Sequence, residues 1–100
     1  MDNARAQELL AAERQRITAE IDELRTDNDG QDLHDVEIAQ GRIEDLEVAL
    51  ESVTRAEERL AAGTYGLSVE SGEPIPDDRL EAVPTAERTV DEERRFKHGG

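Results

Sequence analysis

Four polar residues in the second half of the chain have the spacing of a structural zinc site. Two residues separate Ser68 from Ser71, two separate Thr89 from Glu92, and seventeen lie between the pairs. This matches the frame of four-cysteine zinc sites. Zinc, however, prefers cysteine thiolates and histidine nitrogens, and carboxylates are lesser ligands than these, while hydroxyls are poor ligands at neutral pH. The sequence therefore predicts no metal here, and hydrogen bonds from Ser68, Ser71 and Thr89 in place of the metal.

A second group of residues that could do chemistry is acidic. Between residues 27 and 37 the chain has no Lys or Arg and five acids, which are Asp27, Asp29, Asp32, Asp35 and Glu37. If a helix begins near Asp32, the carboxylates of Asp32 and Asp35 share one face, because residues three apart are neighbours on a helix. Such acids can simply cap a helix start and face solvent. Alternatively, they are presented to a cation or an arginine cluster of a partner.

Two amphipathic helices are predicted to position these acids. Over residues 4–25 the apolar seam consists of Leu10, Ile17, Ile21 and Leu24. Over residues 35–62 the a and d positions of successive heptads hold Val36, Ala39, Ile43, Leu46, Leu50, Val53 and Leu60. Arg14 and Glu57 interrupt these seams, and polar residues at such positions can set register or partner choice.

The segment between the two helices favours reversal of the chain. Residues 26–34 are rich in Asp, Asn and Gly, which are turn-forming residues. A short connection between two amphipathic helices predicts an antiparallel coiled-coil hairpin over residues 1–62, with an acidic tip at about 27–37. Gly63 follows the last heptad, where a left-handed glycine commonly ends a helix. Helices of ~25 residues, rising ~1.5 Å per residue, give a rod of roughly 35–40 Å.

Residues 63–100 are predicted to form a small zinc-finger-like element without metal. The segment Tyr65–Glu70 favours a short strand, and a turn is marked by Gly72, Pro74 and Pro76. One helical turn is expected over Arg79–Ala82, and a last helix over Ala86–Phe96 with Thr85 as its cap. The expected small core consists of Tyr65, Leu67, Ile75, Leu80, Val90 and Phe96. The predicted fold class is mainly α, with short strands and a terminal helix in this element.

The composition excludes several classes of function. The 100 residues carry a net charge of −14, so direct DNA or RNA binding and binding to anionic membranes are disfavoured, because phosphate contacts need clustered Lys and Arg. No stretch approaches 18 apolar residues and no basic segment precedes an apolar run, so we expect no transmembrane helix, no secretory signal and a cytoplasmic location. No phosphate loop or supported nucleophile set is present, so the chain is not expected to be an enzyme or to use a cofactor.

The second half of the chain contains three specific motifs: AAGTYG at residues 61–66, SGEPIP at residues 71–76, and RLEAVPTA at residues 79–86. Together with the spacing of the zinc-like frame, they resemble the DksA/TraR family of bacterial proteins that bind RNA polymerase. The resemblance implies that relatives carry zinc-binding cysteines at four positions, which here are Ser68, Ser71, Thr89 and Glu92. This chain is then a cysteine-less variant of the C4-type finger.

The resemblance also implies a mechanism and a partner. Family members insert the coiled coil into the secondary channel of RNA polymerase, where a D-x-x-D-x-A motif at the tip acts near the active-site magnesium. The similar segment here runs from Asp32 through Asp35 to Glu37, and Glu37 stands where the motif has Ala. We expect the protein to be a monomeric transcription regulator that modulates initiation. Whether a nucleotide effector takes part is not decided by the sequence. The alternative is a structural or adaptor protein that keeps the fold and binds an unrelated protein.

Overall fold

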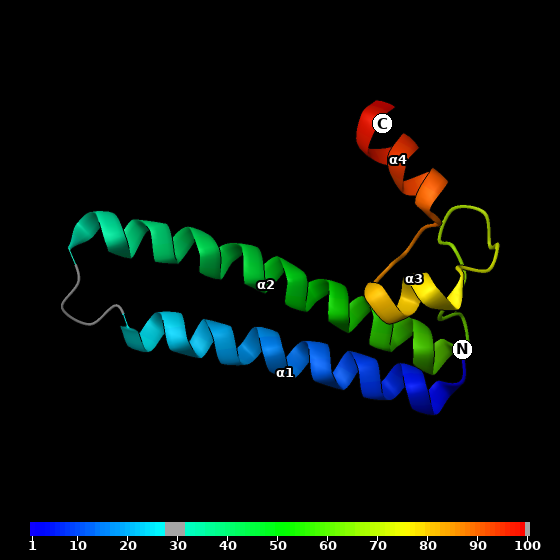
Figure 1. Cartoon of the computed structure of the whole chain (residues 1–100), viewed down its shortest axis with the longest axis horizontal. Coiled ribbons are helices and arrows are strands. Elements are labelled where there is room, and N and C mark those ends of the chain that lie inside the picture. The colour runs from blue at the N-terminus through cyan, green and yellow to red at the C-terminus, as the bar shows by residue number, and fades with distance from the viewer. Residues whose placement is uncertain (28–31, 100) are drawn as a thin grey trace.

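The computed structural model describes residues 1–27 and 32–99, which form four helices (Figure 1). Two long helices, α1 (Asn3–Asp27) and α2 (Leu33–Ala62), run antiparallel along each other. The short helices α3 (Asp77–Ala82) and α4 (Val90–Gly99) belong to the C-terminal element at the opposite end from the tip. The predicted mainly α fold, with a long helical hairpin and a short C-terminal helix, is confirmed.

The hairpin is held together by the seam that the heptad spacing predicts. Its buried cluster consists of Ile17, Ile21, Ile43, Leu46 and Val53, and Leu24, Ala49 and Leu50 pack against it. Leu10 is also fully buried. Val36 was expected in the same seam but is exposed, because it lies in the first turn of α2, close to the end of the hairpin.

The two polar residues that interrupt the seams pair with each other. Arg14 Nη2 lies 2.7 Å from Glu57 Oε1, and the same nitrogen donates to Thr54 Oγ1 at 2.9 Å. This ion pair joins residues 43 positions apart in the chain. The charges that weaken each helix on its own therefore compensate each other across the hairpin and favour one register. Their use in choosing an external partner stays a prediction.

The C-terminal element begins at the predicted glycine. Gly63 has a φ of 83° and its N–H donates to the carbonyl of Leu60 at 3.2 Å, so it ends α2 in the left-handed conformation. A second apolar cluster follows, formed by Ile75, Leu80 and Ala86, with Met1 and Tyr65 packed against it. Tyr65 is anchored there because its hydroxyl donates to the carbonyl of Pro84 at 2.8 Å.

The predicted strand over Tyr65–Glu70 is wrong. Within residues 1–27 and 32–99 the only β pairing is an isolated antiparallel bridge between Leu67 and Pro74. Two glycines in this segment, Gly66 at φ 85° and Gly72 at φ 76°, turn the backbone out of the extended conformation. Pro74 also has no N–H to continue a ladder. The segment therefore closes as a compact loop.

The last helix begins later than the sequence predicted. It starts at Val90 instead of Ala86, and Thr89 replaces the predicted Thr85 as its capping residue. Three predicted core residues, Leu67, Val90 and Phe96, are exposed in the structure. Phe96, with 54% of its surface exposed, instead lies under the Arg88 guanidinium, 3.8 Å from the ring centroid. Val90 and Phe96 lie on a ten-residue helix that projects from the element and has too little contact with it to bury them, whereas Leu67 lies in the loop after α2 (Figure 1).

In the described ranges, none of the helices combines the length and the apolar composition that crossing a bilayer requires.

Candidate functional sites: a carboxylate cluster and an acidic tip

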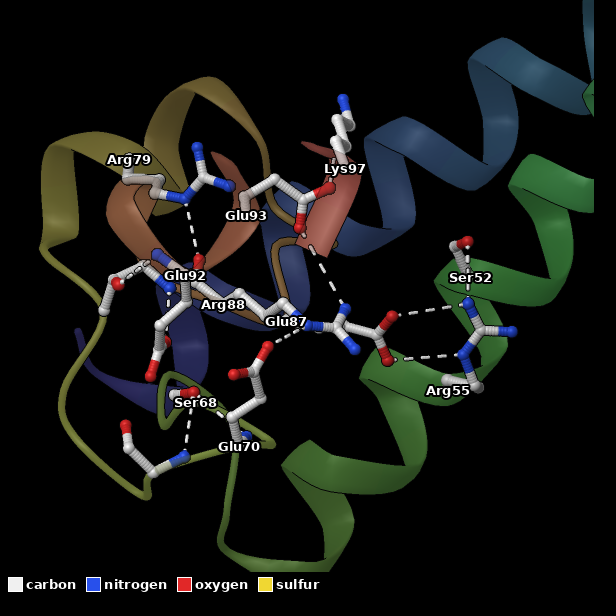
Figure 2. Close-up of polar contacts among 12 residues, drawn as sticks. Ser52, Arg55, Ser68, Glu70, Arg79, Glu87, Arg88, Glu92, Glu93 and Lys97 are labelled. Atoms are coloured by element: carbon white, nitrogen blue, oxygen red, sulfur yellow. Dashed lines mark hydrogen bonds and ion pairs between the residues drawn. The ribbon is translucent and has the colours of Figure 1, made fainter. Parts of the chain in front are cut away.

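The structure brings the four zinc-like positions together around one carboxylate. The carboxylate of Glu92 accepts the backbone N–H of Thr89, which lies 2.9 Å from Oε1 (Figure 2), and the hydroxyls of Ser68 and Ser71 favour its charged form. In return, the N–H of Glu92 donates to Thr89 Oγ1 at 3.3 Å. Ser68 and Glu92 are the two buried polar residues of the described chain, 5% and 6% exposed. We call these four residues the carboxylate cluster.

The loop between α2 and α3 is folded around the same cluster. Ser68 Oγ accepts the backbone N–H groups of Glu70 at 3.1 Å and Ser71 at 3.3 Å, and Ser71 Oγ accepts that of Glu73 at 3.2 Å. Each serine hydroxyl oxygen thus accepts from the backbone of its own loop. The serine side chains of this loop and the Thr89 backbone N–H both act on the buried Glu92 carboxylate, so the carboxylate links the loop to the start of α4.

Thr89 and Glu92 also form the reciprocal hydrogen bonds of a helix capping box. The sequence Thr-Val-Asp-Glu at residues 89–92 has the required pattern, a threonine followed three residues later by glutamate. This local signal could have located the start of α4 from the sequence. It was missed because the pair was interpreted through its zinc-like spacing alone.

The hydrogen bonds lower the pKa of Glu92 from 4.5 to about 2, the Thr89 backbone N–H being the largest cause and the Ser68 and Ser71 hydroxyls the next. A carboxyl group with a lowered pKa stabilises the fold above its unfolded-state pKa, and this contribution is lost as the pH falls toward the folded-state value. Glu92 therefore contributes fully above about pH 5 and progressively less down to about pH 2.

We therefore expect the urea unfolding midpoint to fall more steeply from about pH 5 to about pH 2 in the wild-type protein than in a Glu92→Gln variant, which has no group to titrate there. Unfolding followed by circular dichroism at several pH values measures this difference. Equal pH dependence of the two proteins would contradict the role given to the Glu92 carboxylate.

Zinc does not fit the carboxylate cluster. Three of its four side chains are alcohols, which remain protonated at neutral pH and are poor zinc ligands. Across residues 1–27 and 32–99, no group of three or more His, Cys, Asp or Glu side chains is placed to hold a metal ion. The cluster is therefore a cross-link built from hydrogen bonds.

A second carboxylate, that of Glu87, joins the C-terminal element to the hairpin (Figure 2). Its Oε2 lies 3.0 Å from Arg59 Nη1 and 3.3 Å from Arg55 Nε, both on α2. The carbonyl of Glu87 accepts the N–H of Val69 at 2.9 Å. Two further nitrogens of Arg59 are buried with no hydrogen-bond partner among the described residues, so Glu87 is the main compensation for this guanidinium.

Replacing Glu87 with alanine is expected to destabilise the protein by about 1–3 kcal/mol, because it leaves the nearly buried Arg59 without its counterion. Glu70→Ala provides a matched control. It removes the 2.7 Å ion pair with Arg88, but Glu70 is more exposed, and such pairs contribute at most about 1 kcal/mol. Urea unfolding of the three proteins compares the losses. A loss for Glu87→Ala no larger than that for Glu70→Ala would refute this view of the junction.

The acidic tip lies at the far end of the hairpin from these two sites (Figure 1). Asp32 is the N-cap of α2, and its Oδ1 accepts the backbone N–H of Asp35 at 3.0 Å. Asp35 and Glu37 follow in the first turns of α2 and are exposed. Asp27 is the last residue of α1, and Asp29 lies outside the described residues.

The structure thus separates two acids that the sequence treated alike. The Asp32 carboxylate is engaged in capping α2, whereas in the described chain the Asp35 carboxylate takes part in no hydrogen bond or ion pair. Leu33, beside them, is also exposed. The end of the rod therefore presents the Asp35 and Glu37 carboxylates and an apolar side chain to solvent.

Comparison with known proteins agrees with this architecture. The family described as Prokaryotic dksA/traR C4-type zinc finger matches residues 63–98. The chain is similar to the solved structure of transcription factor DksA2 from Pseudomonas aeruginosa, with 31% sequence identity and a TM-score of 0.69. The match covers 95% of this chain and 82% of the DksA2 chain.

Two further relatives are similar over different extents. General stress protein 16O from Bacillus subtilis (strain 168) is 50% identical over 42 residues, which are 42% of this chain and 26% of that protein. The RNA polymerase binding protein and transcriptional regulator Dks from Chlamydia trachomatis L2 (LGV434) is 25% identical, with coverages of 92% and 91% and a TM-score of 0.48. Since the identity to DksA2 extends over most of both chains and the finger family matches the C-terminal element, the chain belongs to the DksA/TraR family as a cysteine-less member.

Proposed function

We propose that the protein is a transcription regulator that binds bacterial RNA polymerase and acts through the tip of the α1–α2 hairpin. The observation that carries this proposal is the exposed Asp35 carboxylate at the end of a rod in a chain of the DksA/TraR family. The similar protein from Chlamydia trachomatis is described as an RNA polymerase binding protein, and that from Pseudomonas aeruginosa as a transcription factor.

The shape and charge of the molecule support insertion of the hairpin into a channel. The longest dimension of the chain is 49 Å, and the hairpin contributes most of it (Figure 1). A helix of 30 residues such as α2 extends ~45 Å at ~1.5 Å per residue. Such a rod carries its tip away from the C-terminal element, into the secondary channel, toward a site where carboxylates meet cations. The net charge of −14 favours basic protein surfaces over nucleic acid.

The role of the C-terminal element in this proposal is to hold the base of the rod. The Glu87 junction ties it to α2, and the carboxylate cluster closes it without metal. Regulation by this protein is therefore independent of zinc and of thiol oxidation. Addition of EDTA to a binding or transcription assay is expected to leave its activity unchanged, after correction for the metal that the polymerase itself needs.

The proposal is tested by measuring binding of the fluorescently labelled protein to purified RNA polymerase from the source organism, together with transcription from several promoters. We expect saturable binding and a change in transcript yield at the same protein concentrations. Absence of binding would contradict the proposal and favour the alternative of an adaptor for an unrelated protein. Binding without any effect on transcript yield would contradict only the part of the proposal in which the tip alters transcription.

A further inference from the structure

The hairpin and the C-terminal element are joined by ion pairs that all have the same polarity. Across the described residues, every ion pair between side chains of these two parts has its cation on the hairpin and its acid on the element. Within the hairpin, by contrast, α1 supplies the cation of one interhelical pair and the acid of another. We call the residues that connect the two parts the ionic joint: Arg5, Arg55, Arg59, Glu81 and Glu87.

The α1 side of the ionic joint is open to solvent. Arg5 Nε lies 3.0 Å from Glu81 Oε1, and Arg5 Nη2 lies 2.8 Å from Glu81 Oε2. The two side chains are 45% and 43% exposed, so dissolved ions reach both charges. Attraction between such charges weakens with salt, because the Debye length falls from about 30 Å at about 0.01 M to about 3 Å at about 1 M ionic strength. The Arg5–Glu81 pair is therefore sensitive to salt.

The α2 side of the ionic joint carries a cost that opening removes. Glu87 pairs with Arg55 and Arg59, as Figure 2 shows for Arg55. Arg59 Nε and Nη2 are buried without a hydrogen-bond partner among the described residues. Unpaired buried donors cost free energy that they recover in water. The attraction of Glu87 therefore favours the closed joint, whereas the dehydration of Arg59 opposes it.

One short segment of backbone links α2 to the C-terminal element. It contains Gly63 at φ 83° and Gly66 at φ 85°. A Cβ added at Gly63 would meet no atom within 4 Å, so the backbone is open on that side. Glycine also permits large changes of φ and ψ. The apolar clusters of the hairpin and of the element have no residue in common, although Met1 packs against the second. Residues 63–66 can therefore serve as a hinge.

We propose that the ionic joint is a hinge whose closed state is weakened by salt, so that ionic strength sets the angle between the rod and the C-terminal element. At low ionic strength the joint is closed, as in Figure 1. At high ionic strength the attraction of Arg5 for Glu81 is screened, Arg59 becomes hydrated, and the element turns about residues 63–66. In a protein that acts through the end of a rod, this hinge couples the direction of the rod to the surrounding salt concentration. It is a property of the free protein and holds whether or not the protein binds polymerase.

Distances between two spin labels in the free protein test the hinge. The chain has no cysteine, so labels can be placed at Val48→Cys on α2 and Val83→Cys in the element, both exposed positions. We expect one narrow distance at about 0.01 M KCl, and a ratio of open to closed molecules that is roughly tenfold higher at about 1 M. Labels at Glu23→Cys and Val48→Cys span the hairpin alone and should give the same distance at both concentrations. A Val48–Val83 distance that does not change with salt would overturn the proposal.

Removing the acids of the ionic joint should open it without salt. Glu81→Gln/Glu87→Gln is expected to give the open distances at low as well as high KCl. Glu73→Gln/Asp78→Asn is the matched control, because it removes two exposed acids of the element that form no ion pair among the described residues. The control should keep the salt response of the wild-type protein. Equal behaviour of the two double variants would show general repulsion in an acidic chain, and the hinge would then be wrong.

A charge swap separates electrostatic attraction from a general loss of structure. Arg5→Glu should open the joint, and Arg5→Glu/Glu81→Arg should restore the closed distance at low salt, because it exchanges the two charges. The Glu23–Val48 distance shows in each variant whether the hairpin remains folded. Sucrose at the osmolality of the KCl solution should leave the joint closed. Opening in sucrose, or a swap that does not close the joint in a folded protein, would refute control by charge screening.

Discussion

An Asp35→Asn variant is expected to bind RNA polymerase nearly as tightly as the wild-type protein and to lose most of its effect on transcription. Asn has the shape of Asp without its charge, and the backbone N–H of residue 35 can still donate to Asp32. A hydrogen bond or ion pair to a charged group contributes about 1.5–3 kcal/mol, which corresponds to a loss of about ten- to a hundredfold in effect. Transcription over a range of protein concentrations, with binding measured in parallel, separates the two quantities.

Asp32 provides the matched control for this prediction. Asp32→Asn also removes one negative charge near the tip. Because Asn is as good an N-cap as Asp, the start of α2 should be preserved. Its effect on transcription is expected to be small, whereas Asp32→Ala should cost roughly 1 kcal/mol through loss of the cap. If Asp32→Asn abolishes the effect on transcription and Asp35→Asn does not, the assignment of the acting carboxylate to Asp35 is wrong.

The second large effect is expected from restoring cysteine at all four positions of the carboxylate cluster. The variant Ser68→Cys/Ser71→Cys/Thr89→Cys/Glu92→Cys should bind one zinc ion tightly, because the fold already brings these side chains together. Structural zinc in four-cysteine sites contributes an apparent binding free energy of about 10–16 kcal/mol at neutral pH. Cobalt absorption in the thiolate-to-metal region and metal analysis of the purified protein measure the site.

The controls for this variant use the same positions. The wild-type protein should take up no zinc beyond background, since its alcohols are poor ligands. A triple variant that keeps Glu92 should bind zinc more weakly, because carboxylate is a weaker partner than thiolate. Without metal, the four-cysteine variant should be less stable than the wild-type protein, since it lacks the Glu92 hydrogen bonds. A four-cysteine variant that binds no zinc would show that the four side chains do not converge in solution.

The sequence was sufficient to predict the helical hairpin. Helix formation and the heptad seam follow from a local periodicity, which is why Ile17, Ile43 and Leu46 were placed correctly. The end of α2 also follows from a local signal, the glycine at position 63. The exclusion of zinc stays a prediction, which depends only on which donor atoms the four positions offer.

The short strand and the last helix show where local signals failed. The residue types of the segment Tyr65–Glu70 predicted a strand, but Gly66 and Gly72 adopt positive φ angles and turn the chain out of the extended conformation. The start of α4 was available in the Thr89–Glu92 capping box, and only the competing zinc-like interpretation obscured it. Phe96 was predicted in the core from its type alone, although a short projecting helix can leave an aromatic residue exposed.

The tertiary structure decided which charged residues meet. Arg14 and Glu57 are 43 positions apart, and their pairing depends on the register of the hairpin. The Glu87 junction depends on how the C-terminal element sits on α2, and the role of Glu92 depends on a loop that returns to the start of α4. In a chain with 26 acids, composition allows many pairs of charges, and only the packing of distant segments selects among them. The sequence by itself therefore determined a helical rod whose zinc-like frame has no cysteine, because periodicity and residue type are local, while the contacts between distant segments required the fold.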